Sequence, residues 1–319
     1  MRQAVGVDLG GSHTTAAIVD EEGKLQQRHE RDITDRSVDA VVAALLDVVG
    51  AALRDAKGDV AGIGIGSPGN IDPKSGMIRY SPNFGWSNVP LGDRLREKFS
   101  QPIFIANDAR CATLGEYTFG SGRGTKDFVF LTLGTGIGGG IVSAGQLILG
   151  DQMGAGEIGH HAIRPTDGFV CGCGKIGCFE AQASGTGLLR HAFSLAPSFP
   201  RSTLLVPSGD KALGSKAIRR AAQAGDGHAV AAWKHWIDDL AYGLANVIAF
   251  VNPAMISLGG GVSRAGEFML EPLRPLVDER NTMTPRGTTK IVTAMLGNDA
   301  GAIGAATMAM RGALQTLPT

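Results

Sequence analysis

Aromatic residues and unbalanced charge are scarce in this sequence. Only 6% of the 319 residues are aromatic, and 30 basic residues face 30 acidic ones, so the formal net charge is zero. Surfaces that bind nucleic acid or anionic membranes are usually basic, and those that bind nucleic acid often add aromatic side chains. No run of Lys and Arg is present either, so we expect neither a nucleic acid nor a membrane as partner.

An uninterrupted apolar stretch is also missing. The N-terminal MRQAVGVDLGG has no apolar segment of the kind found in a secretory signal. Residues 240–263 contain no charged residue, but Asn246, Asn252, Pro253 and the glycines at 259–261 interrupt them. This segment is expected to form a buried helix followed by a buried strand instead of a membrane span. We therefore expect a cytoplasmic protein.

Cysteine is rare, and three of the four cysteines lie close together as Cys171, Cys173 and Cys178. Three neighbouring thiols cannot all pair with one another, and in a cytoplasmic protein such clusters more often bind metal than form disulfides. Structural zinc sites take four ligands, commonly three cysteines and one histidine. Cys111 lies in a predicted helix and is expected to be an inert buried thiol.

The fourth ligand is then expected to be His160 or His161. Neighbouring side chains on an extended segment point in opposite directions, so only one of the two should reach the metal. Glu157 and Glu180 flank the same region. A glutamate is usually a solvated surface charge, but their position beside the cysteine cluster favours a functional role.

Glycine is abundant, with 47 residues, and gathers in three turns that each follow an apolar strand. They are DLGGSHT (8–14), LGTGIGGG (133–140) and LGGGVS (258–263), and the first two belong to matching strand–turn–strand units. Glycines let backbone N–H groups approach anionic oxygens, and a carboxylate such as Asp8 can hold hydrated Mg²⁺. We expect no helix directly after these turns, which disfavours a dinucleotide-binding βαβ unit. The turns predict a nucleotide held between two lobes.

Strands and helices alternate along the chain. An amphipathic helix is expected over 39–56, a strand before Asn107, and later helices over 184–193, 215–224 and 227–250. A strand before Gly259, a last strand within 288–296 and an Ala/Gly-rich closing helix complete the pattern. It predicts an α/β protein of two similar lobes with a cleft between them. The expected domains are a smaller lobe at 1–107, on which the closing helix near 300–319 packs, and a larger lobe at 108–299.

Asn107 and Asp108 lie between a predicted strand and a predicted helix. Taken alone, this pair favours a helix cap, because both side chains readily accept hydrogen bonds from N-terminal N–H groups. In a cleft, the carboxylate of Asp108 would also suit a general base for a substrate hydroxyl.

Together these motifs resemble the ROK sugar kinases, within the actin/hexokinase/Hsp70 superfamily. VGVDLGGSHTTAAIVD resembles the family's first phosphate motif, LTLGTGIGGGI its second, and LGGGVS its adenosine motif. GEIGH and CGCGKIGCFE resemble its sugar and zinc signature. The matches span nearly the whole chain and are closest to bacterial ATP-dependent glucokinases. His13, where the family often has Lys, is a small departure.

The resemblance implies an actin-like ATPase fold with duplicated ribonuclease H-like lobes. It also implies ATP-dependent phosphorylation of a hexose at its 6-hydroxyl, with D-glucose as the expected substrate. Kinases of the same family that act on N-acetylmannosamine, fructose, mannose or allose are alternatives, and polyphosphate is a lesser donor. A sugar-sensing repressor would carry a helix-turn-helix segment ahead of the first motif, which here begins by Val5. We therefore expect an enzyme, and a homo-oligomer (dimer or tetramer) as in relatives.

The resemblance also implies site residues. Asp108 corresponds to the catalytic base, and His160 is selected as the fourth ligand of a structural zinc. The expected sugar-binding residues are Gly69, Asn70, Asn83, Asn107, Asp108, Glu157, His160 and Glu180. The expected ATP- and Mg²⁺-binding residues are Asp8, Gly10, Gly11, Ser12, His13, Thr14, Gly134, Thr135, Gly136, Gly138, Gly260 and Gly261. The expected zinc ligands are His160, Cys171, Cys173 and Cys178.

Overall fold

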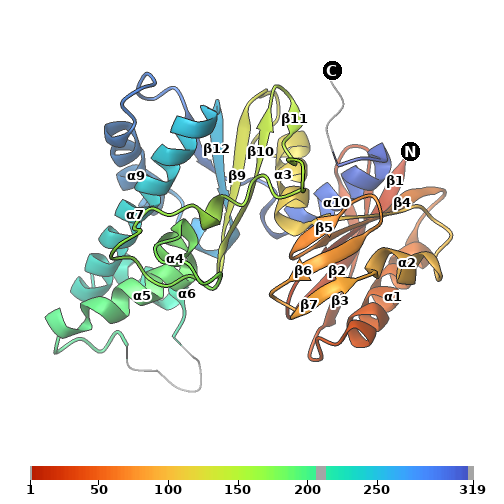
Figure 1. Ribbon diagram of the computed structural model, residues 1–319, viewed down its shortest axis with the longest axis horizontal. Coiled ribbons are helices and arrows are strands. Elements are labelled where there is room, and N and C mark those ends of the chain that lie inside the picture. The colour runs from red at the N-terminus through yellow and green to blue at the C-terminus, as the bar shows by residue number, and fades with distance from the viewer. Residues whose placement is uncertain (1, 206–212, 315–319) are drawn as a thin grey trace. The chain divides into compact units, whose positions relative to one another are not determined.

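The computed structural model describes residues 2–205 and 213–314, and these divide into two compact units (Figure 1). Unit 1 takes its described residues from 1–126, 140–156 and 295–319. Unit 2 takes them from 127–139 and 157–294.

The main sheet of unit 1 has the strand order β3-β2-β1-β4-β8. β1 (Gln3–Leu9), β2 (His13–Asp20) and β3 (Leu25–Asp32) form an antiparallel meander, while β4 (Val60–Ser67) and β8 (Ile103–Asn107) run parallel to β1. Because the carboxyl ends of parallel strands meet at one edge, β1, β4 and β8 deliver their last residues to the same place. The predicted first strand–turn–strand unit is confirmed by β1 and β2.

Two helices pack on this sheet through alternate residues of its strands. α1 (Val38–Asp55) follows the predicted amphipathic pattern, and its apolar stripe packs with the side chains of Val5, Val7 and Leu9. α10 (Ala300–Arg311) contacts β1, β4 and α3 (Asp108–Phe119) (Figure 1). Since successive residues of a strand point to opposite faces, Asp8 lies on the α10 face.

The contact of α10 with the sheet leaves no room for side chains. A Cβ on Gly6 would lie 1.9 Å from Ala302 O, and one on Gly64 would lie 1.8 Å from Ala305 O. On the other side of α10, a Cβ on Gly304 would lie 1.7 Å from Cys111 O of α3. Glycine at these positions therefore lets strand, α10 and α3 come into backbone contact.

This packing also explains a difference in the domain boundary. The sequence predicts that the first lobe ends at Asn107, whereas by contacts α3 and the chain up to Lys126 belong with unit 1. The reason is that α3 packs against α10. The last residues of the predicted closing segment, 315–319, lie outside the described part of the chain.

A second five-stranded sheet has the order β11-β10-β9-β12-β13. Its strands are β9 (Phe128–Leu133), β10 (Ile137–Ser143), β11 (Gln146–Leu147), β12 (Met255–Gly259) and β13 (Lys290–Thr293), with β12 parallel to both β9 and β13. The matching strand–turn–strand unit and the two later strands are confirmed. β12 also follows the long helix as predicted for residues 240–263, and no helix within the described residues combines the length and hydrophobicity needed to span a bilayer.

Unit 2 contributes most of the helices. The predicted ones appear as α5 (Gly185–Leu195), α6 (Ser215–Gln223) and α7 (Gly227–Val251), and α4 (Phe179–Ala183) precedes them. α9 (Glu267–Arg280) was not predicted, because Pro272 and Pro275 within it are typical of a helix break. The small sheet of unit 1, made of β5 (Asn70–Asp72), β6 (Met77–Ser81) and β7 (Trp86–Val89), and the short α2 (Leu91–Arg96) after it were missed as well.

We predict that Gly304→Ala destabilises the protein by about 1–3 kcal/mol, a typical cost of overpacking. Alanine favours a helix over glycine, so a loss would come from the collision with α3. The measurement is urea unfolding of the variant, with Gly154→Ala as control because a Cβ at Gly154 meets nothing within 4 Å. A Gly304→Ala protein as stable as wild type would contradict this packing.

Candidate active site

Two carboxylates lie at the carboxyl edge of the unit 1 sheet. Asp8 pairs in register with Gly66 of β4, Gly66 pairs with Ala106 of β8, and Asp108 begins α3 directly after that strand. A Cβ on Gly66 would lie 3.3 Å from Asp108 Cα. Parallel pairing thus brings together two acidic residues that are far apart in the sequence.

The environment of Asp8 disfavours its charge. The carboxyl keeps a little exposed surface, but protein surrounds it on most sides, and a Cβ on Gly301 of α10 would lie 3.0 Å from its Cγ. Burial, and then the nearby negative charge of Asp108, raise the pKa of Asp8 to about 6, while His13 lowers it. A cation bound here would relieve both penalties, which suits a carboxylate that holds a divalent ion.

The capping interpretation applies to Asn107 and not to Asp108. Asn107 is the N-cap of α3, where its side chain accepts a hydrogen bond from Arg110 N at 3.2 Å, and its Nδ2 donates to Gly69 O at 3.1 Å. Asp108 Oδ1 accepts from Ala109 N at 2.8 Å. Asn107 thus caps the helix and also holds the Gly69 turn through its amide, while one carboxylate oxygen of Asp108 accepts from the next N–H group of the helix.

The first glycine turn, between β1 and β2, is partly open to solvent. Gly10 N donates to His13 O at 2.9 Å, and Ser12 and His13 are exposed. Thr14 is fully buried and its hydroxyl donates to Asp8 O at 3.3 Å. Of the predicted ATP-binding residues in this turn, Thr14 thus braces the strand end, Gly10 closes the turn on His13, and Gly11 is partly exposed.

The predicted sugar residues of unit 1 lie on the small sheet and the turns around it. Asn83 is exposed, and its carbonyl accepts from Arg36 Nη1 at 3.1 Å. Gly69 has a φ of +116°, and a Cβ there would lie 2.3 Å from Tyr80 O. Asn70 Nδ2 donates to Gln152 O at 3.4 Å, while its Oδ1 is buried with no partner among the described residues. That oxygen is an unused acceptor.

The second and third glycine turns are neighbours within unit 2. Gly185 N, at the start of α5, donates to Gly134 O at 2.8 Å, and Thr186 Oγ1 donates to Thr135 O at 2.8 Å. Gly260 has a φ of +84°, and a Cβ there would lie 2.6 Å from the carbonyl carbon of Leu133. The start of α5 and the third turn therefore both fix the residues at the end of β9.

One expectation about the turns is wrong. A helix, α8 (Gly260–Ser263), begins within the third turn, directly after β12, although no helix was expected there. It is a single turn, made possible by the left-handed backbone of Gly260. The first two turns lead into the strands β2 and β10.

The cysteine cluster brings four potential metal ligands together. The ligand atoms of His160, Cys171, Cys173 and Cys178 all lie within 4.8 Å of one another. His160 Nδ1 is 3.7 Å from Cys171 Sγ, and Cys173 Sγ is 3.6 Å from Cys178 Sγ. In a tetrahedral zinc site with Zn–S bonds of about 2.3 Å, ligand atoms lie roughly 3.5–3.8 Å apart, so the donor set fits zinc.

Only His160 of the two neighbouring histidines contacts the cysteines, but the reason differs from the predicted one. His160 ends the 3-10 helix η1 (Ile158–His160) instead of lying on an extended segment. The His161 ring lies 5.2 Å from the Phe179 ring, and its Nδ1 is 2.6 Å from Ile158 O. Burial lowers the pKa of His161, which favours a neutral ring that donates to that carbonyl.

Glu180 connects the cysteine cluster with the second glycine turn. Its Oε1 lies 3.6 Å from Cys171 Sγ, and its Oε2 accepts a hydrogen bond from Ile137 N at 2.8 Å. A Cβ on Gly136 would lie 2.2 Å from Oε2, so the glycine gives the carboxylate its place. Gly138 lies one residue beyond Ile137 on β10, and Glu157 is exposed at the start of η1.

Two buried charged residues on α3 were missed by the sequence reasoning. Arg110 donates from Nε and Nη2 to Ala155 O, at 3.1 and 2.6 Å, and so holds the segment before Glu157. Glu116 accepts from the backbone N–H groups of Met295 and Leu296. Nothing in the sequence distinguishes them from the solvated charges that helices usually carry. The predicted inert role of Cys111 is supported, since it is fully buried and burial raises its pKa.

Comparison with known proteins agrees with this arrangement. A family model described as "ROK family" matches residues 4–311. A glucokinase from Thermotoga maritima is 40% identical over 310 residues, which cover 95% of this chain and 96% of that protein. The chain belongs to the ROK family, and the resemblance is confirmed.

Solved structures extend the similarity to the fold. A ROK family glucokinase from Streptomyces griseus, in complex with glucose and AMPPNP, matches with a TM-score of 0.85 and 35% identity over 97% of this chain and all of that one. A ROK hexokinase from Thermus thermophilus matches with a TM-score of 0.80 and 32% identity over 95% of this chain and 96% of that one. The α/β, two-lobed, actin-like fold class is confirmed.

We predict that Asp8→Asn stabilises the protein at pH 8 when no magnesium is added. Folding raises the pKa of Asp8 from 3.8 to about 6, so ionisation costs folding free energy above pH 6 and costs nothing below about pH 4. The variant should gain about 1–3 kcal/mol at pH 8, and the gain should disappear towards pH 4. Urea unfolding at both pH values measures this, with the exposed Asp32→Asn as control. Equal stability of wild type and Asp8→Asn at pH 8 would refute the assigned environment.

Proposed function

We propose that this protein transfers the γ-phosphoryl group of ATP to the 6-hydroxyl of D-glucose. The observation that carries the proposal is the pair Asp8 and Asp108 at one strand edge, in a chain whose relatives include glucokinases. The Streptomyces griseus relative was crystallised with glucose and an ATP analogue, and its fold matches over nearly the whole chain.

Asp108 acts as the general base in this proposal. Phosphoryl transfer depends mainly on positioning and charge neutralisation, with a carboxylate that accepts the proton of the attacking hydroxyl. Asp108 starts a helix that packs against α10, so its backbone is rigidly placed. Asn107 supports it by capping that helix and holding the Gly69 turn.

Asp8 holds Mg²⁺ through its carboxylate, directly or through water. Mg²⁺ held there would neutralise negative charge on the phosphates of ATP. The raised pKa of Asp8 fits this role, because a bound cation would offset the burial and the Asp108 charge that raise it. The turns at 10–13 and 134–138 contact the phosphates through N–H groups other than those of Gly10, Gly134 and Ile137, which donate within the protein. Gly260 and Gly261 serve the adenosine.

Hexose hydroxyls are recognised by side chains of the small sheet and of the loop that follows Gly156. The orphaned Oδ1 of Asn70 is an acceptor for a sugar hydroxyl, since a buried acceptor without a partner is costly. Asn83, Glu157, His160 and Glu180 supply further polar contacts. Because unpaired polar groups penalise analogues that lack a hydroxyl, these residues set the choice of sugar.

Zinc fills a structural role at His160, Cys171, Cys173 and Cys178. Four protein ligands complete a tetrahedral ion and leave no open position for catalysis. When bound through Nδ1, which faces Cys171, His160 keeps its opposite edge for the sugar. Burial raises the pKa of Cys171 to about 12, so binding the ion must displace its proton. The homo-oligomer and the cytoplasmic location stay predictions.

We predict that Asp108→Asn lowers kcat for glucose by about 10²–10⁴-fold, the range for loss of a general base, with a smaller change in the KM for glucose. A coupled ADP-release assay over glucose, mannose, fructose, allose and N-acetylmannosamine measures this, with the exposed Asp47→Asn as control. Activity on no hexose, or full activity of Asp108→Asn, would refute the proposal.

We also predict that Cys173→Ser loses zinc and raises the KM for glucose about tenfold, a typical cost of disturbing a metal site. Cys173 is the exposed cysteine of the cluster, so the substitution removes a ligand without a buried cavity. Elemental analysis and glucose kinetics measure the effect, and Cys111→Ala should keep its zinc. Zinc-free protein with full activity and stability would show that the ion has no structural role.

A further inference from the structure

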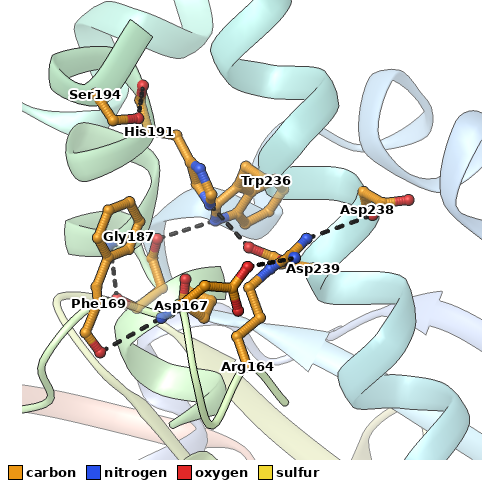
Figure 2. A network of polar contacts seen from close by, with 11 residues as sticks. Arg164, Asp167, Phe169, Gly187, His191, Ser194, Trp236, Asp238 and Asp239 are labelled. Atoms are coloured by element: carbon orange, nitrogen blue, oxygen red, sulfur yellow. Dashed lines mark hydrogen bonds and ion pairs between the residues drawn. The ribbon is translucent and has the colours of Figure 1, made fainter. Parts of the chain in front are cut away.

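The loop that carries the cysteines is also fastened to helices by side chains that bind no metal. We call residues 161–178 the cysteine loop. Arg164 Nε donates to Asp239 Oδ1 at 2.5 Å, and Arg164 Nη2 lies 3.7 Å from Asp238 Oδ2. Both aspartates lie on α7. Figure 2 shows Arg164 reaching from the loop towards the two aspartates.

Asp239 is unusual because it is a fully buried carboxylate. Its Oδ2 lies 3.0 Å from His191 Nε2 of α5, but the two atoms are not aligned for a hydrogen bond. When a buried carboxylate loses its partner cation, the folded protein is strongly destabilised, because a charge stays buried without compensation. If the loop left α7, Arg164 would leave with it and Asp239 would lose that cation. The charge pair therefore penalises detachment of the loop more than an apolar contact would.

Arg164 is tied through its backbone to the metal side of the loop. Ile163 N and Arg164 N donate to Gly177 O, at 2.8 and 3.2 Å, and Ala162 pairs with Cys178 in an antiparallel bridge. Gly177 has a φ of +76°, and a Cβ there would lie 1.8 Å from Arg164 O. A shift of Arg164 would therefore also move Gly177 and Cys178, because the two backbone segments are hydrogen-bonded to each other.

A second part of the cysteine loop, Phe169 and Val170, is held by α5. The Phe169 ring lies edge-on to the His191 ring, with centroids 5.1 Å apart, and Arg190 Nη1 donates to Val170 O at 2.7 Å, next to Cys171. His191 thus contacts both Phe169 and the Asp239 carboxylate. The cysteine loop is therefore fastened to α7 through Arg164 and to α5 through Phe169 and Val170.

From this arrangement we propose that Arg164 is a positioning residue for the sugar site. Its ion pair with buried Asp239 sets the place of the cysteine loop, and through it the place of the zinc ligands and of His160. The effect on the sugar rests on the proposed kinase function, whereas the effect on zinc does not.

The test is Arg164→Met, which removes the charge and keeps most of the length. In zinc-loaded protein we expect release of zinc to a chromophoric chelator to be about tenfold faster and the KM for glucose about tenfold higher, as for residues that support a metal site. The kcat and the KM for ATP should stay as in wild type. Wild-type zinc release together with a wild-type glucose KM would overturn the proposal.

Arg280→Met is the matched control. Arg280 lies at the end of α9 and pairs with Asp238 of α7. Its guanidinium carbon also lies 4.3 Å from the ring centroid of Tyr242, which is on α7 as well. We expect this variant to keep wild-type zinc release and glucose KM. If Arg280→Met matches Arg164→Met in both, the effect is not specific to the loop and the proposal fails.

A double variant distinguishes an effect of Arg164 on the position of the cysteine loop from an effect on the stability of the protein. Arg164→Met/Asp239→Leu replaces the ion pair by apolar side chains, which is often neutral or stabilising, so its Tm should exceed that of Arg164→Met. Zinc release should nevertheless stay fast. Recovery of zinc retention together with Tm would show that Arg164 acts only through stability and would overturn the proposal. If the wild type phosphorylates no hexose, the kinase function fails, while the comparison of zinc release still tests the anchor.

Discussion

The close approach of α10 to the first sheet is the constraint on which the catalytic geometry depends. Only glycine fits at Gly6, Gly64 and Gly304, where strand, helix and α3 are in backbone contact. That contact places the start of α10 against Asp8 and fixes α3, whose first residue is Asp108. Asp8 and Asp108 are thereby held at one edge of the sheet, where burial and the charge of Asp108 disfavour the ionisation of Asp8.

In unit 2 the candidate residues lie on loops and turns, so a sheet edge does not hold them in place. There the rigidity comes from polar contacts: Glu180 joins the cysteine cluster to Ile137, α5 holds the second glycine turn, and Arg164 ties the cysteine loop to Asp239. Loops carry binding residues well when a scaffold positions them. A zinc ion would add a further constraint where His160 and the three cysteines converge.

Local signals in the sequence were enough to predict the strand–glycine–strand units, the helix α1 and the cysteine cluster, because each follows from neighbouring residues. The helix α9 was missed because Pro272 and Pro275 within it are typical of a helix break. The helix α8 was missed because a single helical turn shows no hydrophobic periodicity. Glu116 and Arg164 could not be recognised, because the burial of a charge depends on partners such as Leu296 and Asp239 that are distant in the chain. Tertiary contacts alone reveal those.

The central claim is that the protein transfers the γ-phosphoryl group of ATP to the 6-hydroxyl of a hexose. The most direct measurement is an NMR spectrum of the product formed from ATP and D-glucose, in which phosphorus coupling identifies the carbon that bears the phosphate. The account predicts coupling to the two protons on carbon 6. Coupling to the proton on carbon 1, or release of inorganic phosphate without a sugar phosphate, would contradict it.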